Sequence, residues 1–372
     1  MKYKKILNKE KRNRKKRQMN NKIILKKSKK NKSVNLAKKN INLGIELLRM
    51  ILSFLIVLVH DYIRRVNTKI AMFPNRFLPY YVPCFFLIGF YFSFNTIVSR
   101  NIDKIKQRFI RIIIPYMGWP IIFWLENNYY YYRYRIYSRT QFKFLYTQLL
   151  IGCGLHGILW FLFNLLFISI LFTIFVFMFK KCFLIFLFLL TIICYRFEFS
   201  IYQNIFFNKF NKMPIKHSIG PIPRSIIFSF TGFFLGSINV INKYYKFRII
   251  TILFFGSLLF IILYYDLLYR VTFFYQGFII DLVAISAFSV FSMIPFDKIN
   301  NKYIFSILKI ITSHTGGVYY LHPKVADMFS KYFEPIRLRF FKGCVQIYLI
   351  SYLICFIGTI LFRRTYIKFL FN

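Results

Sequence analysis

The sequence predicts an all-α, polytopic integral membrane protein with about ten transmembrane helices. Hydrophobic residues make up 57% of the 372-residue chain, and its mean hydropathy is +0.49, which is more apolar surface than a soluble protein can bury. Apolar runs of about 20 residues, long enough to cross a bilayer, follow one another through most of the chain. These runs are continuous rather than alternating, which excludes an outer-membrane β-barrel.

The N-terminal 40 residues differ in composition from the rest. Residues 1–40 hold 18 of the 54 Lys and Arg residues and a single acid, Glu10. This composition predicts a disordered cytoplasmic arm, which ahead of a membrane span is expected to contact anionic lipid headgroups rather than nucleic acid. Alternatively, translation starts at Met19 and residues 1–18 are not part of the protein. Residues 41–372 are expected to form one transmembrane domain.

Ten apolar segments are expected to be helical. They cover 43–62, 78–98, 109–126, 157–178, 182–196, 223–240, 248–268, 272–294, 303–326 and 344–362. The fifth segment is short and polar residues interrupt the ninth, so each of these two is either a span or a re-entrant segment.

The basic arm sets the predicted orientation. It places the N-terminus in the cytoplasm, and an even number of spans then places the C-terminus there as well. The basic stretch 99–111, predicted as a compact loop between the second and third helices, supports this orientation. The loops taken together do not add support, because they carry 15 Lys and Arg inside and 19 outside.

Several common catalytic signatures are absent from the sequence. The six cysteines fall mostly within or beside the apolar segments and form no Cys-x-x-Cys pair, so no metal or disulfide site is expected. No Gly-x-x-x-x-Gly-Lys-Ser/Thr motif and no Gly-x-Ser-x-Gly motif occurs. The sequence therefore indicates neither ATP hydrolysis nor a serine hydrolase.

The first apolar segment carries three ionisable residues along one face. Arg49 and His60 are eleven residues apart, about three helical turns, and Glu46 lies three residues before Arg49. A charge at the bilayer centre costs roughly 2.5–3.5 kcal/mol, so this stripe is expected to face protein or a water-filled cavity, with Glu46 and Arg49 paired. Alternatively, Glu46 and Arg49 lie at the headgroup boundary and extend towards water.

Five segments carry short patterns in a fixed order along the chain. They are NLGIELLRMILSFLIVLVH (42–60), VPCFFLIGFYFS (82–93), KQRFIRIIIPY (106–116), LHGILWFLFNLLF (155–167) and SHTGGVYYLHPKV (313–325). Together they resemble the membrane-bound acyltransferase 3 family, the glycan O-acyltransferases. The matching patterns are an acid with Leu-Arg and a closing His, Phe-Phe-x-x-Ser-Gly, Arg-x-x-Arg before Pro, Leu-Trp-Phe-Leu, and Gly-x-Tyr-x-x-His-Pro. The resemblance covers residues 41–362 and implies a helical bundle like that of the family.

The second of these segments departs from the family pattern. Ile88, directly before Gly89, stands where the family has serine. A hydroxyl near the acyl path is therefore expected to be missing, and the donor preference is expected to differ. Glu46 stands where many members have aspartate, which is a conservative difference.

The resemblance implies transfer of an acyl group, usually acetyl, from a cytoplasmic acyl-CoA such as acetyl-CoA to a sugar hydroxyl, with no permanently bound cofactor. A sugar hydroxyl needs a base at neutral pH, and His60 is the candidate. Asp61 points about 100° away on a helix and is not assumed to assist. Arg49 is expected to hold a carboxylate or a donor phosphate. Arg108 and Arg111 either bind a phosphate group of the donor or anchor the chain at the cytoplasmic surface.

Four further candidate residues lie in the last two segments. His322 precedes Pro323, which frees a backbone carbonyl and kinks a helix. His322 is therefore either aimed into a cavity for catalysis or packed as a buried histidine. Trp160 and Tyr319 are expected to contact substrate or donor, and His156 is expected to line the acceptor entrance.

The remaining ionisable residues of the apolar segments match no motif. Asp281 is an intramembrane carboxylate and therefore a candidate functional residue, for which a lysine or arginine such as Arg49 is the expected partner. His217 and His314 are expected to lie outside the site.

Three classes of function fit these observations. The leading one is a glycan O-acyltransferase of the cytoplasmic membrane that acts on a polysaccharide of the cell envelope. The alternatives are a polysaccharide exporter, which would use the intramembrane charges as a permeation path, and a non-catalytic scaffold. No internal repeat is found, which weighs against an exporter. A scaffold leaves the charged stripe of the first helix unexplained.

Overall fold

The computed structural model describes most of the chain after residue 41. The described residues are 42–65, 72–133, 149, 160–198, 222–269, 276–294, 302–312, 314–332 and 340–371. The chain divides into two units, Met1–Leu43 and Gly44–Asn372, and all described residues except Asn42 and Leu43 belong to the second. The predicted basic arm at 1–40 lies outside the described residues.

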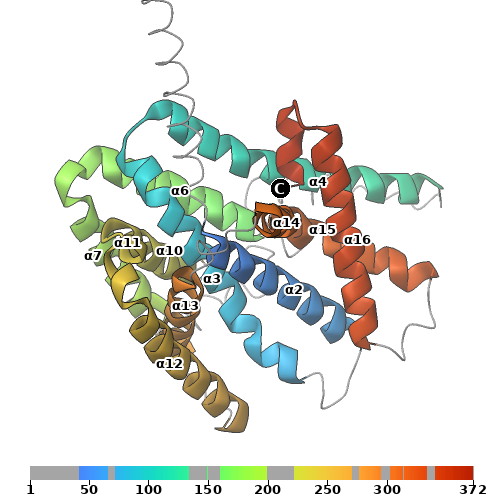
Figure 1. Ribbon diagram of the computed structural model, residues 1–372. Helices are drawn as coiled ribbons and strands as arrows, with labels where there is room; N and C mark the ends of the chain where they lie inside the picture. The colour runs from blue at the N-terminus through green and yellow to red at the C-terminus, as the bar shows by residue number, and fades with distance from the viewer. Residues whose placement is uncertain are drawn as a thin grey trace, which may run out of the picture. The chain divides into compact units, whose positions relative to one another are not determined.

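All regular structure in the described residues is helical, and no strand occurs among them (Figure 1). The longer helices are α2 (Leu43–Arg65), α3 (Met72–Val98), α4 (Ile102–Arg133), α6 (Trp160–Phe179), α7 (Phe183–Glu198), α10 (Ile222–Ser237), α12 (Arg248–Tyr269), α13 (Gln276–Met293), α14 (Lys302–Thr312), α15 (Thr315–Tyr332) and α16 (Phe340–Leu361). The short ones are η2 (Lys180–Cys182), α11 (Val240–Tyr244), η3 (Tyr245–Phe247) and η7 (Tyr366–Leu370). The predicted all-α class is confirmed in the described residues, and each predicted segment overlaps at least one of these helices.

The basic stretch 99–111 is not the loop that the sequence predicted. It is helical from Ile102 onwards, so most of its charges lie on the first turns of α4. The side-chain oxygen of Asn101 accepts the backbone N–H of Lys104 at 3.0 Å, which caps this helix. Charge alone predicted a loop, whereas the cap and the apolar residues between the charges extend the helix.

The ninth predicted segment, 303–326, is two helices rather than one. α14 ends at Thr312, and α15 begins at Thr315. The carbonyl oxygen of His314 accepts the backbone N–H of Val318 at 3.1 Å and so begins the hydrogen bonds of the second helix. The polar residues that interrupt the apolar pattern thus mark a break between helices.

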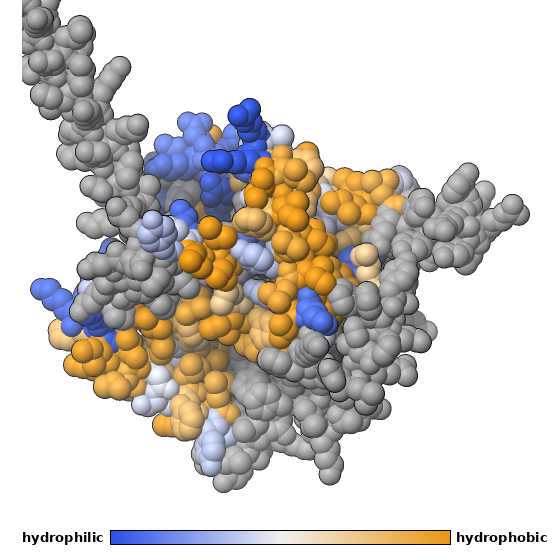
Figure 2. Space-filling view, turned by 45° about the vertical axis from the view of Figure 1, so that its right-hand side comes forward, coloured by the Kyte–Doolittle hydropathy of each residue, from blue (hydrophilic) through white to orange (hydrophobic). Residues whose placement is uncertain are grey.

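Five helical stretches of the described residues are long and apolar enough to cross a membrane. They are Tyr81–Val98, Ile102–Leu125, Trp160–Phe197, Val240–Tyr264 and Gly343–Leu361. In α12, Ile249, Leu253 and Phe260 are 67%, 64% and 69% exposed. Hydrophobic side chains also cover most of the described surface on the face shown in Figure 2. So large an apolar surface is typical of helices in contact with lipid.

Helices α3 and α10 pack closely through two glycines of α10. Gly232 and Gly236 are four residues apart and share one face of the helix. A Cβ atom added at Gly232 would overlap the Leu87 carbonyl oxygen, and one added at Gly236 would lie 2.9 Å from the Tyr91 carbonyl oxygen. The Gly-x-x-x-Gly spacing therefore lets the two backbones approach, as small residues do in membrane helix pairs.

The chain beyond α16 folds back onto the helices. η7 lies against α4 and α16, where the red C-terminal segment ends beside α4 in Figure 1. Glycines on α4, α15 and α16 leave room for its last residues, Leu370 and Phe371. A Cβ atom at Gly118 would overlap the Leu370 side chain. One at Gly317 would lie 2.6 Å from the Phe371 carbonyl oxygen, and one at Gly358 would lie 2.7 Å from the Phe371 ring.

His314, for which no role was predicted, holds this segment in place. Its ring is buried, and Nδ1 lies 3.3 Å from both the Phe371 carbonyl oxygen and the Thr359 hydroxyl oxygen. Because a carbonyl oxygen only accepts, the ring nitrogen donates to Phe371. His314 thus links α15, α16 and the C-terminal residues, whereas His217 lies outside the described residues.

Candidate active site

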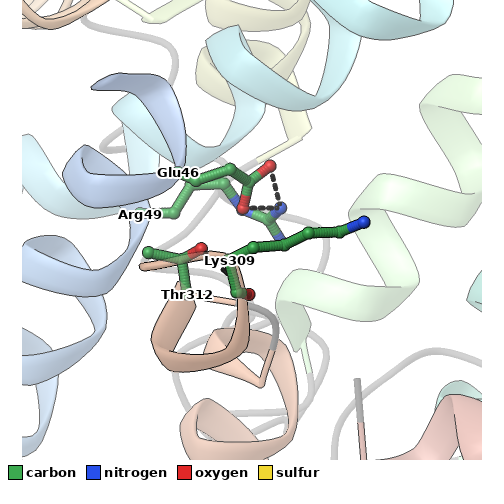
Figure 3. Close-up of polar contacts among 4 residues, drawn as sticks. All are labelled: Glu46, Arg49, Lys309 and Thr312. Carbon is green, nitrogen blue, oxygen red and sulfur yellow. Dashed lines mark hydrogen bonds and ion pairs between the residues drawn. The ribbon is translucent and has the colours of Figure 1, made fainter. Parts of the chain in front are cut away.

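The charged pair near the start of α2 forms as predicted. Nη1 of Arg49 donates to both carboxylate oxygens of Glu46, at 3.2 Å and 3.1 Å, and the two side chains are 34% and 23% exposed. Figure 3 shows this pair together with Lys309 and Thr312 of α14. The charge of Arg49 also acts on the buried Tyr320 of α15. Other helices therefore enclose much of the pair.

The face of α2 that continues from Arg49 is covered by protein. Ser53, one turn further on, is fully buried, and its hydroxyl is hydrogen-bonded to the Tyr348 hydroxyl of α16 at 3.1 Å. Ile56, nearly one turn beyond Ser53, is buried as well. Up to Ile56 the stripe faces neighbouring helices, in agreement with the prediction that it avoids lipid.

His60 extends this stripe by one more turn. The helical backbone of α2 continues through His60 and Asp61 to Arg65, so the spacing of three turns from Arg49 is kept. The side chains of His60 and Asp61 lie outside the described part of the structure. The role of His60 as the base therefore stays a prediction.

Arg108 lies between α3 and α6 rather than at a free surface. Its Nη2 donates to the Ser169 hydroxyl of α6 at 3.1 Å, and its guanidinium lies 5.5 Å from the centre of the Phe90 ring of α3. Its Nε is buried and has no hydrogen-bond partner in the described residues. These contacts with α3 and α6 show that Arg108 does more than anchor the helix at the headgroups, and its role in binding the donor stays a prediction.

Arg111 follows one turn later in quite different surroundings. It is exposed, and its guanidinium lies 5.7 Å from the centre of the Phe369 ring in the C-terminal segment. The like charges of Arg108 and Arg111 act on each other. The two arginines of the Arg-x-x-Arg motif thus belong to one positively charged region, in which Arg108 is the inner residue and Arg111 the outer one.

Tyr319 and His322 of α15 lie beside the first turn of α6. The Tyr319 ring is buried, with its centre 5.6 Å from that of Phe161 and 6.3 Å from that of Phe85. The ring centre of Trp160, the first residue of α6, lies 6.5 Å from that of Phe161. The ring centre of His322 lies 6.3 Å from that of Tyr319. The structure therefore brings three candidate residues from two segments into one aromatic cluster.

His322 is 1% exposed, and one of its two ring nitrogens forms a hydrogen bond. Its Nδ1 lies 3.2 Å from the Val318 carbonyl oxygen, one turn earlier in α15. Since that carbonyl only accepts, Nδ1 carries the proton, and the lone pair of the neutral ring is on Nε2. Both predicted alternatives, a packed histidine and an oriented base, fit this arrangement. His156 lies outside the described residues.

A comparison with protein families finds one that covers most of the chain. A family model described as an acyltransferase domain matches residues 42–363. The chain belongs to the acyltransferase 3 family. The family predicted from five short segments is thus confirmed, and the protein is an acyltransferase. Comparisons with curated proteins and with solved structures found no match.

Asp281 of this acyltransferase lies near an arginine, as predicted, but that arginine is not Arg49. The Asp281 carboxylate on α13 interacts with the charge of Arg224 on α10 and with Tyr195 on α7. The sequence did not indicate Arg224, because it does not show which helices surround α13. Oδ1 of Asp281 is buried and has no hydrogen-bond partner in the described residues.

The position at which the resemblance predicts a serine is apolar in this acyltransferase. Ile88 is buried in the core. The next serine of α3, Ser93, directs its hydroxyl to the Gly89 carbonyl oxygen. The effect of Ile88 on the choice of donor stays a prediction.

Two residues of the site were missed in the sequence. Ser53 had a usable signal, because it lies four residues after Arg49 and therefore on the same face of the helix. Ser169 had no such signal in the sequence, because it contacts Arg108, a residue 61 positions earlier on another helix.

Proposed function

We propose that this acyltransferase is an integral protein of the cytoplasmic membrane that moves an acyl group, normally acetyl, from a cytoplasmic acyl-CoA to a hydroxyl of a cell-surface or secreted glycan. In this proposal the chain crosses the membrane an even number of times, and both termini are cytoplasmic. The basic arm at 1–40 contacts anionic lipid headgroups. Family membership and the apolar surface of the described helices support the proposal.

One observation carries the catalytic part of the proposal, namely the protein-facing stripe of α2. Arg49, paired with Glu46, is followed by the buried hydroxyl of Ser53 on the same face, and the next polar position on that face is His60. Polar groups in an otherwise apolar helix cost free energy in a membrane. They are therefore expected where a reaction uses them.

His60 is the proposed base. Its imidazole removes the proton of the acceptor hydroxyl while the hydroxyl oxygen attacks the thioester carbonyl carbon. The carbon–sulfur bond then breaks, and the thiolate leaves with the proton that the imidazolium returns. Arg49, three turns away on the same face, binds a phosphate or carboxylate of the donor at a distance from this carbon, and Glu46 holds the guanidinium in place. His322 is the alternative base, with Nε2 as the accepting atom.

The remaining candidate residues are proposed to bind the two substrates. Arg108 and Arg111 bind phosphate groups of the donor, for which the planar fork of arginine is suited. Trp160 and Tyr319 form an aromatic wall against which a sugar ring or the acyl chain packs. Each of these roles is separable from that of the base, because loss of a binding residue raises KM first.

The experiment that tests the proposal is mass spectrometry of the surface glycan. Cells with the intact gene are compared with cells that lack it and with cells that carry the His60→Ala protein. An acyltransferase predicts the same glycan in all three, lighter by one acyl group per acceptor site in the last two. A glycan that disappears from the surface, with its acylation unchanged inside the cell, would instead identify an exporter.

A further inference from the structure

The C-terminal residues occupy a fixed position on the described helices. Leu370 and Phe371 fill the space left by Gly118, Gly317 and Gly358, and the His314 ring donates to the Phe371 carbonyl oxygen. Glycines from three separate helices converge on two consecutive residues, so this segment is a fitted part of the structure. The family match ends at residue 363, before the segment begins its turn.

This fit places two cations on the same aromatic ring. The Phe369 ring lies 5.7 Å from the guanidinium carbon of Arg111 and 5.3 Å from the Nζ atom of Lys368. Arg111 comes from the third turn of α4, and Lys368 comes from η7, more than 250 residues later in the chain. The C-terminal segment therefore places a lysine and the outer arginine of the Arg-x-x-Arg motif against the same ring.

No acid compensates these charges in the described residues. Neither Arg111 nor Lys368 lies within ion-pair distance of a carboxylate there, and Arg108 adds a third positive charge one turn away on α4. Like charges near one another repel, and the free energy of this electrostatic repulsion is lowered when an anion binds between them. A phosphate group fits, because it accepts several charged hydrogen bonds at once from arginine and lysine.

We propose that the C-terminal segment completes the donor site, with Lys368 binding a nucleotide phosphate of the acyl-CoA together with Arg111. The inference rests on the proposed function and adds to it a residue beyond the family match. Phosphate also occurs in lipid headgroups, and the geometry alone fits either source. We assign the phosphate to the nucleotide of the acyl-CoA, because Arg111 belongs to the same motif as Arg108. The guanidinium of Arg108 lies between α3 and α6, inside the helices.

The test measures binding of coenzyme A to the full-length protein in nanodiscs. Lys368→Ala is expected to weaken binding roughly tenfold, at the low end for one charge-assisted hydrogen bond, and Lys368→Arg is expected to retain it. Lys243→Ala is the control, because the Nζ atom of Lys243 lies 5.6 Å from the centre of the neighbouring Tyr244 ring, as that of Lys368 lies over the neighbouring Phe369 ring, but Lys243 belongs to α11. The thermal midpoint without ligand reports whether each variant is folded.

Two further measurements identify the ligand group. Acetyl-pantetheine, which lacks the nucleotide phosphates, is expected to serve as a donor equally well for the wild type and Lys368→Ala. The combined Arg111→Ala and Lys368→Ala protein is expected to lose less affinity than the product of the single losses, because both side chains bind one group. A lysine that only packs on Phe369 would leave the affinity for coenzyme A unchanged as well, and its substitution would show no coupling with that of Arg111.

The results separate a failure of the role proposed for Lys368 from a failure of the proposed function. If the wild type does not bind coenzyme A, both proposals are overturned. If the wild type binds and Lys368→Ala binds as tightly, only the role of the C-terminal segment is overturned. An effect of Lys368→Ala that appears in nanodiscs with phosphatidylglycerol and vanishes in pure phosphatidylcholine would assign the site to a lipid headgroup and overturn it as well.

Discussion

Replacement of Gly232 by alanine tests the close contact between α10 and α3. The added Cβ atom would lie 2.8 Å from Leu87 Cα and overlap the Leu87 carbonyl oxygen. Carbon atoms pack at about 3.5–4.0 Å, so α10 and α3 must separate by about 1 Å. Such overpacking typically costs about 1–3 kcal/mol, and the better helix propensity of alanine returns at most about 1 kcal/mol. We expect a net loss of stability.

The control is the same substitution where space is available. Gly256 lies in α12, and a Cβ atom there would meet only Val290 Cγ2, at 4.0 Å. Gly256→Ala is therefore expected to leave stability unchanged or raise it slightly. The assay is the fraction of full-length protein that stays monodisperse in detergent after heating. Gly232→Ala is expected to lower the midpoint by about 2–5 °C. A midpoint at or above that of Gly256→Ala would refute the close contact of α10 with α3.

Four further predictions concern activity and orientation. His60→Ala is expected to abolish glycan acylation at normal protein levels, since a general base contributes about 10²–10⁴-fold; retained acylation would move the base to His322. Arg49→Lys is expected to damage activity because lysine lacks the planar fork, whereas a headgroup-bound arginine would tolerate the change. Removal of residues 1–30 is expected to leave acylation largely intact; its collapse in a normally inserted protein would give the arm a second role. A reporter active only outside the cell and fused after Asn372 is expected to stay silent, and a signal would mean an inverted chain or an odd number of spans.

The helices of this acyltransferase were predictable because each is encoded locally. A continuous apolar run of bilayer length and the residues that flank it suffice to place a helix within a few positions. The pair of Glu46 and Arg49 was predictable for the same reason, since three residues along one helix fix their distance. The break after Thr312 was visible only as polar residues in an apolar segment, which fits two helices as well as one interrupted helix.

Contacts between distant segments were not predictable in this way. The partner of Asp281 is Arg224 rather than Arg49 because of how the helices are arranged, and no spacing in the sequence encodes that choice. The C-terminal residues were expected only to be cytoplasmic. Their position depends on glycines from three helices, each unremarkable in its own segment. The Gly-x-x-x-Gly of α10 did carry a local signal, because that spacing is typical of close helix pairs in membranes.

Helix α15 connects the two halves of the proposed site. Its Tyr320 lies within the electrostatic reach of Arg49 on α2, and its Tyr319 packs on the start of α6. Its Gly317 lies against Phe371, so the C-terminal segment that presents Lys368 rests on the same helix. A shift of α15 would therefore move the donor side and the proposed catalytic stripe together. A bulky residue at position 317 is accordingly expected to weaken coenzyme A binding and acyl transfer in parallel, whereas the loss of a separate tail contact would affect binding alone.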